Sequence, residues 1–304
     1  MDGIINVYKE AGFTSHDVVA KLRGICRQKK IGHTGTLDPQ ATGVLPVCLG
    51  SATRACEMLT DRTKEYVAEL LLGKITDTQD TTGTVLEERE VAVDEAQVRE
   101  VIGSFVGGYD QIPPMYSALK VNGKKLYELA RAGKEVERQA RHVDLPAIEI
   151  LEIRLPVVKF RVECSKGTYI RSLCADIGGK LGCGGTMQSL VRTRVGEFRL
   201  TDALTLTQLQ ELRDTGRLEE ALLPTDRIFA DFNAVHVEEK WRKLIDNGNA
   251  FYPGQTMEQT TYPVGEWVRV YREDDSFVGI YAYDGAKAWY KPVKIFPSNT
   301  ESRK

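Results

Sequence analysis

One carboxylate stands alone in a stretch of small, turn-forming and hydroxyl-bearing residues, GHTGTLDPQATGVL, which spans residues 32–45. This carboxylate belongs to Asp38, and the proline that follows it restricts its backbone to extended geometry. The stretch runs directly into an apolar segment, so Asp38 is expected on a stiff loop beside a buried strand. A single acid held in this way suits a nucleophile; the alternative is an ordinary turn in which Asp38 bonds only its own backbone.

Two further groups stand at the start of predicted elements. Tyr66 opens an apolar strand predicted over residues 64–73, where its ring is expected as a core aromatic. Tyr169 and Arg171 lie at the start of a predicted helix for which Thr168 is the expected N-cap. Because a helix N-terminus favours negative charge, an anion is expected there; the alternative for Arg171 is a plain surface arginine.

Residues 111–143 carry a local excess of positive charge, although the whole chain has a net charge of −2. Any RNA-binding surface must therefore come from local clustering. The segment indicates a contact with a phosphate backbone, and a solvated hairpin is the alternative. Its basic residues are Lys120, Lys124, Lys125, Arg131, Lys134, Arg138 and Arg141, with Tyr116 and Tyr127 between them.

Strands and helices that could position these groups alternate along the chain. Strands are predicted over residues 3–7, 44–49, 64–73 and 157–165, and helices beginning near Ser15, Asp94, Thr168 and Thr205. From Asn233 onwards, a predicted helix over residues 238–245 and short alternating strands separated by turn signals indicate a small β-barrel. The chain of 304 residues is thus expected to form one large domain and one small one.

Composition excludes several classes of protein. The six cysteines form no CxxC pair and the four histidines are scattered, so we expect reduced thiols and neither zinc nor disulfides. The first residues do not resemble a signal peptide, and no apolar run approaches about 18 residues. We therefore expect a cytoplasmic protein that makes no membrane contact.

The stretch around Asp38 is similar to the catalytic-loop motif of the TruB family, the tRNA pseudouridine-55 synthases. Other strings resemble the family's remaining motifs, in the family's order: Lys-x-Tyr at residues 64–66, KGTYIRSL at 166–173 and LxRTxxG at 190–196. Residues 9–15 resemble the family's first motif, KPxGxTS, although Glu10 stands where proline is usual. This resemblance spans nearly the whole chain.

The resemblance implies an α+β pseudouridine-synthase fold, with a mixed, mainly antiparallel sheet flanked by helices and a small C-terminal PUA-like β-barrel. It divides the chain into a catalytic domain over residues 1–232, with a thumb-like insertion at about 111–143, and an RNA-binding domain over 233–304. It implies that Asp38 is catalytic, that Arg171 pairs with it, and that Tyr66 stacks on the target base. The implied substrate-binding residues are His33, which fills the space of the flipped base, Tyr169 and Leu190 in the pocket, Lys9 beside the catalytic loop, and Lys124 and Lys125 in the thumb.

The implied reaction isomerises uridine 55 in the T arm of tRNA. Its glycosidic cleavage gives the ribose oxocarbenium character, which a carboxylate can stabilise or capture. The leaving uracil anion delocalises its charge, so one carboxylate suffices, and Tyr66 is a candidate base for the final proton at C5. This chemistry implies no cofactor and no metal. The expected partner is a T-arm stem-loop, bound by a monomer with no obligate protein partner.

Two other functions stay open. An RNA-binding or RNA-folding protein would use only the barrel and the thumb, but the intact set of Asp38, Tyr66 and Arg171 argues against binding alone. An RNA-guided synthase would work within a complex. The chain lacks long basic tails and has a thumb-like insertion, which favours action on its own.

Overall fold

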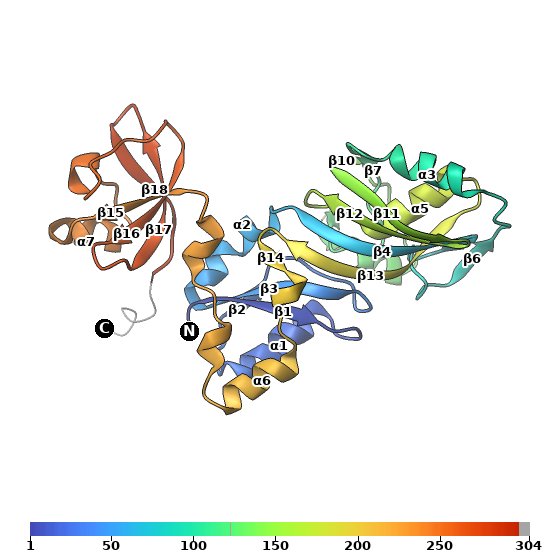
Figure 1. Cartoon of the computed structure of the whole chain (residues 1–304), viewed down its shortest axis with the longest axis horizontal. Helices are drawn as coiled ribbons and strands as arrows, with labels where there is room; N and C mark the ends of the chain where they lie inside the picture. The colour runs from blue at the N-terminus through green and yellow to red at the C-terminus, as the bar shows by residue number, and fades with distance from the viewer. Residues whose placement is uncertain (122, 298–304) are drawn as a thin grey trace.

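The computed structural model of the chain describes residues 1–121 and 123–297 (Figure 1). A large sheet with its helices and a small C-terminal sheet lie at opposite sides of an elongated molecule (Figure 1). Residue 122 of the predicted thumb and residues 298–304 of the predicted C-terminal domain lie outside the described residues.

The large sheet is mixed and mainly antiparallel, as predicted. Its eight strands follow the order β1-β3-β13-β4-β12-β11, with β2 beside β3 and β14 beside β13. Within the described residues of this sheet, β13 and β3 form the one parallel pair. Its strands are β1 (Gly3–Lys9), β2 (Ile31–His33), β3 (Thr42–Leu49), β4 (Lys64–Leu72), β11 (Ala147–Arg154), β12 (Val157–Cys164), β13 (Gly185–Val195) and β14 (Phe198–Arg199).

Alternating side chains give the central strands one buried face. In β12, Val158, Phe160, Val162 and Cys164 are buried, as the sequence pattern predicts, and β4 shows the same alternation. The buried face of β4 and β12 packs on α3 and α5, whereas α1 and α6 pack on β1 and β3 (Figure 1).

The α-helices are short. Among the described residues, none combines the length and the apolarity needed to cross a membrane. The α-helices are α1 (Ser15–Ile25), α2 (Cys56–Thr60), α3 (Glu95–Gly103), α4 (Leu126–Arg131), α5 (Ile170–Lys180), α6 (Leu206–Asp214) and α7 (Arg242–Asp246). The 3₁₀ helices are η1 (Gly50–Ala55), η2 (Leu200–Asp202), η3 (Leu218–Ala221), η4 (Thr225–Phe229), η5 (Glu239–Trp241) and η6 (Pro253–Gln255).

Two predicted helix details are wrong. The helix predicted over residues 238–245 is split into η5 and α7, since Trp241 closes the first turn before α7 begins. Thr168 is not the N-cap of α5, because Tyr169 occupies that position. The Thr168 hydroxyl instead donates to the Ser165 carbonyl (3.0 Å) and closes the preceding turn.

The basic segment 111–143 is closed at its base by a pair of short strands, β7 (Tyr109–Gln111) and β10 (Arg141–Val143). Between them lie the small hairpin of β8 (Lys120–Val121) and β9 (Lys124–Lys125), and then α4. A separate hairpin of β5 (Lys74–Thr76) and β6 (Val85–Glu88) follows the central strand β4.

The C-terminal part folds around its own sheet, β15-β16-β17-β18. Bridges from Thr256 to Val237 on β15 and from Phe251 to Tyr290 on β18 connect the two outer strands through one segment. This closure gives the small sheet the barrel-like form that was expected. Its strands are β15 (Asn233–Val237), β16 (Trp267–Arg272), β17 (Phe277–Asp284) and β18 (Trp289–Ile295).

An aromatic cluster joins the two parts of the chain. The Phe229 ring lies 6.2 Å from that of Phe277 and 5.9 Å from that of Phe296, measured between ring centroids. These rings belong to a buried cluster that also includes Val195 and Phe198 of the large sheet. The two parts therefore share apolar surface, and removing residues from 233 onwards would expose Phe229 to water.

Candidate active site

The loop that carries Asp38 joins β2 to β3, and side chains from other elements hold it in place. The Leu37 N–H donates to the Ser15 hydroxyl (2.9 Å), and the Lys9 ammonium donates to the Pro39 carbonyl (3.0 Å). The Asp38 carboxylate does not simply cap its own turn, because it faces Arg171 on α5. Contacts from β1 and α1 therefore hold the loop in place, while its carboxylate is directed toward α5.

Arg171, in the first turn of α5, meets the carboxylate of Asp38 with two nitrogens. Its Nε lies 2.8 Å from Oδ2, and its Nη2 lies 3.3 Å from Oδ1. The buried guanidinium also donates to the carbonyls of Thr78 (2.9 Å) and Tyr116 (2.8 Å). These carbonyls fix the plane of the guanidinium, so it presents two donors side by side to the carboxylate.

Burial and neighbouring charges shift the pKa of Asp38 in opposite directions. Burial raises the pKa of Asp38 above its ordinary value of 3.8, and the positive charge of Arg171 opposes this rise. Asp80 contributes to the higher pKa through repulsion, whereas Lys9 lowers it through attraction. Arg171 is therefore the main group that keeps Asp38 ionised in a partly desolvated place.

A cavity of about 730 Å³ opens beside this ion pair. Its walls come from the Asp38 loop, the start of β4, the basic segment, the start of α5 and the middle of β13. Four tyrosine rings and one ion pair suit a flat, partly polar ligand such as a nucleobase. The lining includes Asp38, Lys64, Tyr66, Tyr116, Ser117, Tyr127, Arg131, Tyr169, Arg171, Leu190 and Arg192.

Tyr66 lies on the wall of this cavity and is 7% exposed. Burial raises the pKa of Tyr66 above its ordinary value of 10, so the neutral phenol is the form present near pH 7. Stacking on a base needs only the ring, whereas accepting a proton from C5 would be favoured by a phenolate. Burial therefore disfavours the phenolate that a base role would need.

Tyr169 and Leu190 also line the cavity. The Tyr169 main chain is held by one side-chain amide, since its N–H donates to Gln111 Oε1 (2.8 Å) and its carbonyl accepts from Gln111 Nε2 (3.0 Å). Gln111 is buried at the base of the basic segment, so this segment and the start of α5 are connected directly.

Two predicted substrate-binding residues lie elsewhere. Lys9 is 0% exposed and sits beneath the loop, where its ammonium bonds the Pro39 and Glu10 carbonyls, so a direct substrate contact is corrected to a structural role. Burial lowers the pKa of Lys9 to about 8. His33 ends β2 with its ring edge-on to His16 (5.3 Å between centroids), outside the cavity lining formed by the described residues. Burial lowers the pKa of His33 to about 4, so its ring is neutral at pH 7.

Lys124 and Lys125 lie on β9 at the rim of the basic segment. Lys124 is exposed, whereas the ammonium of Lys125 lies 5.3 Å from the centre of the Tyr127 ring. Arg131 contacts the same ring at 5.5 Å. Because Tyr127 and Arg131 line the cavity, the basic segment supplies one of its walls and carries positive charge to its entrance.

Two residues of the site are missing from the set predicted by sequence. Asp80 lies 3.9 Å from Arg171 Nη1, measured from Oδ2, and its other oxygen accepts the Thr82 N–H (3.0 Å). Arg192 is buried beside Tyr66. A polar loop directly after a strand could have indicated Asp80. Arg192 is the fixed arginine of the LxRTxxG string, whereas Arg194 stands at a variable position of it, but the string does not show that Arg192 is buried.

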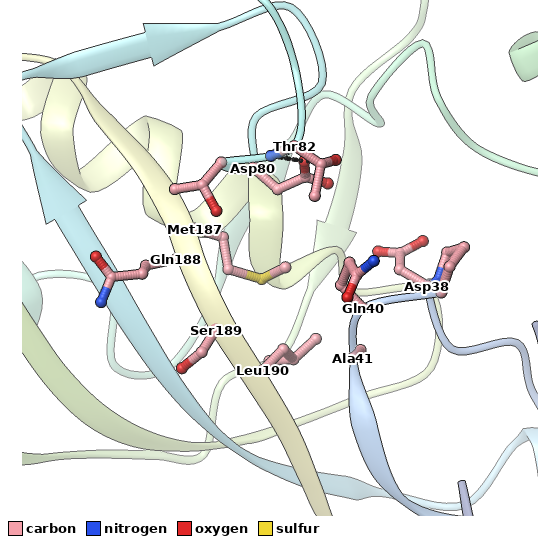
Figure 2. Close-up of a pocket in the computed structure, with 11 residues that line it drawn as sticks. Asp38, Gln40, Ala41, Asp80, Thr82, Met187, Gln188, Ser189 and Leu190 are labelled. Atoms are coloured by element: carbon pink, nitrogen blue, oxygen red, sulfur yellow. Dashed lines mark hydrogen bonds between the residues drawn. The ribbon is translucent and has the colours of Figure 1, made fainter. Parts of the chain in front are cut away.

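A second pocket of about 390 Å³ adjoins the first and shares Asp38, Asp80 and Leu190 with it. Figure 2 shows Asp38 and Gln40 on their loop facing the stretch of β13 from Met187 to Leu190. The carboxylate of Asp38 is thus accessible from two adjoining hollows.

The described residues provide no cluster of three or more His, Cys, Asp or Glu side chains that could hold a metal ion. All six cysteines are free thiols.

Comparison with known proteins identifies the family. Residues 23–170 match the family described as TruB family pseudouridylate synthase, N-terminal domain, and residues 171–230 match the tRNA pseudouridylate synthase B C-terminal domain. The chain belongs to the TruB family. These matches include Asp38, Tyr66, Arg171 and Leu190, so the candidate active site lies within the matched region.

Several relatives named tRNA pseudouridine synthase B are similar over nearly their full length. The protein from Lachnoclostridium phytofermentans is 53% identical over 97% of this chain and 100% of its own length. The protein from Alkaliphilus oremlandii is 49% identical, with 92% of each chain covered. That from Bacillus cytotoxicus is 40% identical, with 99% of each covered.

Two solved structures have a similar fold over nearly the whole of this chain. One is titled as an H/ACA RNP bound to a substrate RNA containing 2′-deoxyuridine, with 27% identity, a TM-score of 0.73, and 97% of this chain and 85% of that chain covered. Another is an archaeal box H/ACA sRNP Nop10-Cbf5 complex, with 28% identity, a TM-score of 0.72, and 98% and 87% covered. The expected α+β pseudouridine-synthase fold is thereby confirmed.

Proposed function

We propose that this TruB-family chain converts uridine 55 in the T arm of tRNA to pseudouridine. The observation that carries the proposal is the Asp38–Arg171 ion pair, which stands at a cavity lined by four tyrosines. The names of the relatives, which match at least 92% of this chain in the three cases above, support tRNA as the substrate.

The reaction is an isomerisation in which one bond breaks and another forms at the same carbon. The N1–C1′ bond breaks and uracil leaves as an anion, while the Asp38 carboxylate stabilises or captures the positive charge at C1′. The base then rotates, and a C5–C1′ bond forms. A proton leaves C5 and N1 gains one, so neither an oxidant nor a cofactor is required.

The cavity walls supply the positioning that this sequence of steps requires. Flipping the uridine out of a folded loop costs a few kcal/mol, and stacking of a base on an aromatic ring contributes about 1–3 kcal/mol. We assign that stacking to Tyr66, with Tyr169 and Leu190 as the other walls. Arg171 keeps the carboxylate ionised and oriented during the rotation.

The parts outside the cavity bind the rest of the RNA in this proposal. The thumb at about 111–143 closes on the stem-loop, and the PUA-like domain over residues 233–304 contacts the tRNA beyond it. Residues 1–232 form the catalytic domain. The enzyme acts in the cytoplasm, where its tRNA substrate is found, as a monomer without an obligate protein partner, and the same RNA contacts can assist tRNA folding.

An RNA-guided synthase is the second candidate, because the two solved structures cited above are described as protein–RNA assemblies. The chain accounts for 85% of the first of those chains, whereas it accounts for the whole of the Lachnoclostridium relative. This difference favours a synthase that acts alone.

Turnover by the purified chain tests the proposal. An unmodified T-arm stem-loop labelled with tritium at C5 of uridine should release tritium, and mapping should place pseudouridine at position 55. A matched stem-loop with cytidine at that position should release none from it. Absence of turnover unless a guide RNA or a second protein is added would overturn stand-alone action, and binding without any turnover would leave only an RNA-binding role.

Removal of positive charge from the thumb should weaken tRNA binding. The triple variant Lys124→Gln, Lys125→Gln, Arg131→Gln should lower affinity and reduce the slope of log K against log salt, by about 0.7–0.9 for each phosphate that the protein no longer neutralises. Binding titrations over a range of salt concentrations measure both effects.

A matched control separates local contacts from net charge. Lys74, Arg99 and Arg217 each pair with a glutamate away from the cavity, and their replacement by glutamine changes the net charge equally. This control should keep most of the salt slope. An unchanged slope in the thumb variant would remove these three residues from the binding surface.

The pH dependence should show an acid limb set by Asp38. Only the ionised carboxylate can stabilise or capture C1′, and burial places its pKa above 3.8. We therefore expect kcat/KM to fall as the pH is lowered through this raised pKa, at a higher pH than for an ordinary aspartate. A profile that stays flat down to pH 4 would show that Asp38 is not the titrating group.

A further inference from the structure

Arg192 is the largest fully buried side chain among the described residues, with 1% of its surface exposed. The proposed steps of uridine isomerisation give it no role. It lies where β13 touches both neighbouring strands of the site. Its register partners are Gly43 on β3, into which the Asp38 loop runs, and Tyr66 on β4. One residue therefore stands between the two groups that act on the nucleotide.

The side chain of Arg192 bonds both ends of the Asp38 loop. Its Nε donates to the Val44 carbonyl (2.7 Å), just after the loop, and its Nη2 donates to the Gly35 carbonyl (3.2 Å), just before Asp38. A planar guanidinium can hold two such acceptors at a set separation, which an ammonium cannot do as well.

The main chain of Arg192 is just as close to the loop. A Cβ atom added at Gly43 would come 2.2 Å from the Arg192 carbonyl oxygen, and Gly43 has a φ of +107°. Only glycine is suited to both conditions. The exit of the loop is thus packed against the Arg192 backbone, while the entrance of the loop is tied to its side chain.

The charge of Arg192 has no obvious use in stability. Both loop groups that it bonds are neutral carbonyls, and the described residues place no carboxylate within ion-pair distance of it. A buried cation costs desolvation energy that an apolar side chain of similar volume would avoid. Packing alone would not require a guanidinium here. The position of Arg192 beside Tyr66 and beneath the Asp38 loop does, because the guanidinium bonds two carbonyls of that loop.

We propose that Arg192 is a positioning residue that fixes the two ends of the Asp38 loop and its distance from Tyr66, so that the carboxylate and the stacked base keep their relative positions while uracil rotates. The proposal rests on the proposed pseudouridine synthase activity. It assigns Arg192 no contact with RNA: the residue contributes to the cavity wall, but only 1% of it is exposed.

The test compares Arg192→Met, which removes the guanidinium at similar volume, with Arg192→Lys, which keeps the charge and part of the bonding. Arg194→Met is the matched control, because Arg194 lies on the same strand and pairs with Glu163 (2.8 Å) outside the cavity lining. Three quantities are measured on the T-arm stem-loop: the single-turnover rate at saturating enzyme, the Kd for RNA, and the Tm of the protein. Rates are compared well below the lowest Tm.

A positioning role predicts a loss in rate without a loss in affinity. Arg192→Met should lower the single-turnover rate about 100-fold, as expected for a misplacement of about 1 Å in a reacting group, with Kd changed less than about 3-fold. Arg192→Lys should recover part of the rate, and Arg194→Met should keep nearly all of it.

The outcomes separate this inference from the proposed function. Wild-type protein without turnover would overturn the function itself. Active wild type together with an unimpaired Arg192→Met, or with equal losses in Arg192→Met and Arg194→Met, would overturn the inference alone. A loss confined to affinity would do the same. If Arg192→Met does not fold, a wild-type rate in Arg192→Lys decides against the inference.

Discussion

Asp38→Asn is expected to abolish pseudouridine formation while tRNA still binds. The amide has nearly the shape of the carboxylate, so the loop held by Ser15 and Lys9 should keep its path. It carries no charge with which to stabilise or capture C1′. A loss of about 10⁴-fold or more in single-turnover rate is expected, comparable in scale with the removal of a nucleophile in other enzymes.

Affinity in this variant should stay within a few-fold of wild type. The expected binding surfaces are the thumb, the ring of Tyr66 and the C-terminal domain, and none depends on the Asp38 charge. Affinity could rise slightly, because one anion near the RNA phosphates is removed. Arg171 keeps its bonds to the Thr78 and Tyr116 carbonyls, so the cavity wall should stay in place.

The measurement pairs mapping of pseudouridine with a binding titration on the same preparation. Asp214→Asn makes the same chemical change on the exposed end of α6 and should leave rate and affinity unchanged. Appreciable product from Asp38→Asn would remove Asp38 from the reaction, and with it the main support for the proposed mechanism.

Arg171→Lys is expected to lower kcat by about 100-fold, the equivalent of one charge-assisted hydrogen bond of about 2–3 kcal/mol. Lysine keeps the positive charge but cannot face two carboxylate oxygens and two carbonyls at once, as Arg171 does. The Asp38 carboxylate should therefore become less well oriented, although its electrostatic attraction to residue 171 is largely kept.

The same variant should move the acid limb of the pH profile. Arg171 opposes the rise that burial causes in the pKa of Asp38, so a weaker contact lets this pKa rise further. The acid limb of kcat/KM should then shift to higher pH. Arg194→Lys, made in a pair with Glu163, should change neither kcat nor the limb. A near-wild-type kcat with an unmoved limb would show that Arg171 does not orient Asp38.

Local signals in the sequence were sufficient for much of the scaffold. The alternation in β12 predicts its buried residues because a pleated strand directs successive side chains to opposite faces. Helices begin near Asp94 and Thr205 as predicted, and these two residues cap α3 and α6, since a short polar side chain can bond the first free N–H groups of its own helix. The prediction that Thr168 caps α5 was wrong because its hydroxyl donates to a carbonyl of the preceding turn.

The contacts of the side chains around the Asp38 loop could not be predicted from such local signals. Lys9 and His33 belong to the motifs of the site, yet Lys9 is buried under the loop and His33 packs against His16. Arg192 and Arg194 are two residues apart on β13, yet Arg192 bonds the loop from within and Arg194 pairs with Glu163. Neighbouring positions of the same residue type had different partners because those partners come from other strands.

The residues that can do the chemistry, and the short elements that carry them, are predictable from sequence, because a motif, a cap or an alternating strand depends on residues a few positions apart. Which of these residues meet depends on the folded chain. Arg171 reaches Asp38 across 133 positions, and Arg192 reaches Gly35 across 157. Burial then sets the charge of each group, because the pKa of a side chain depends on the water and the charges that folding removes from it or places beside it.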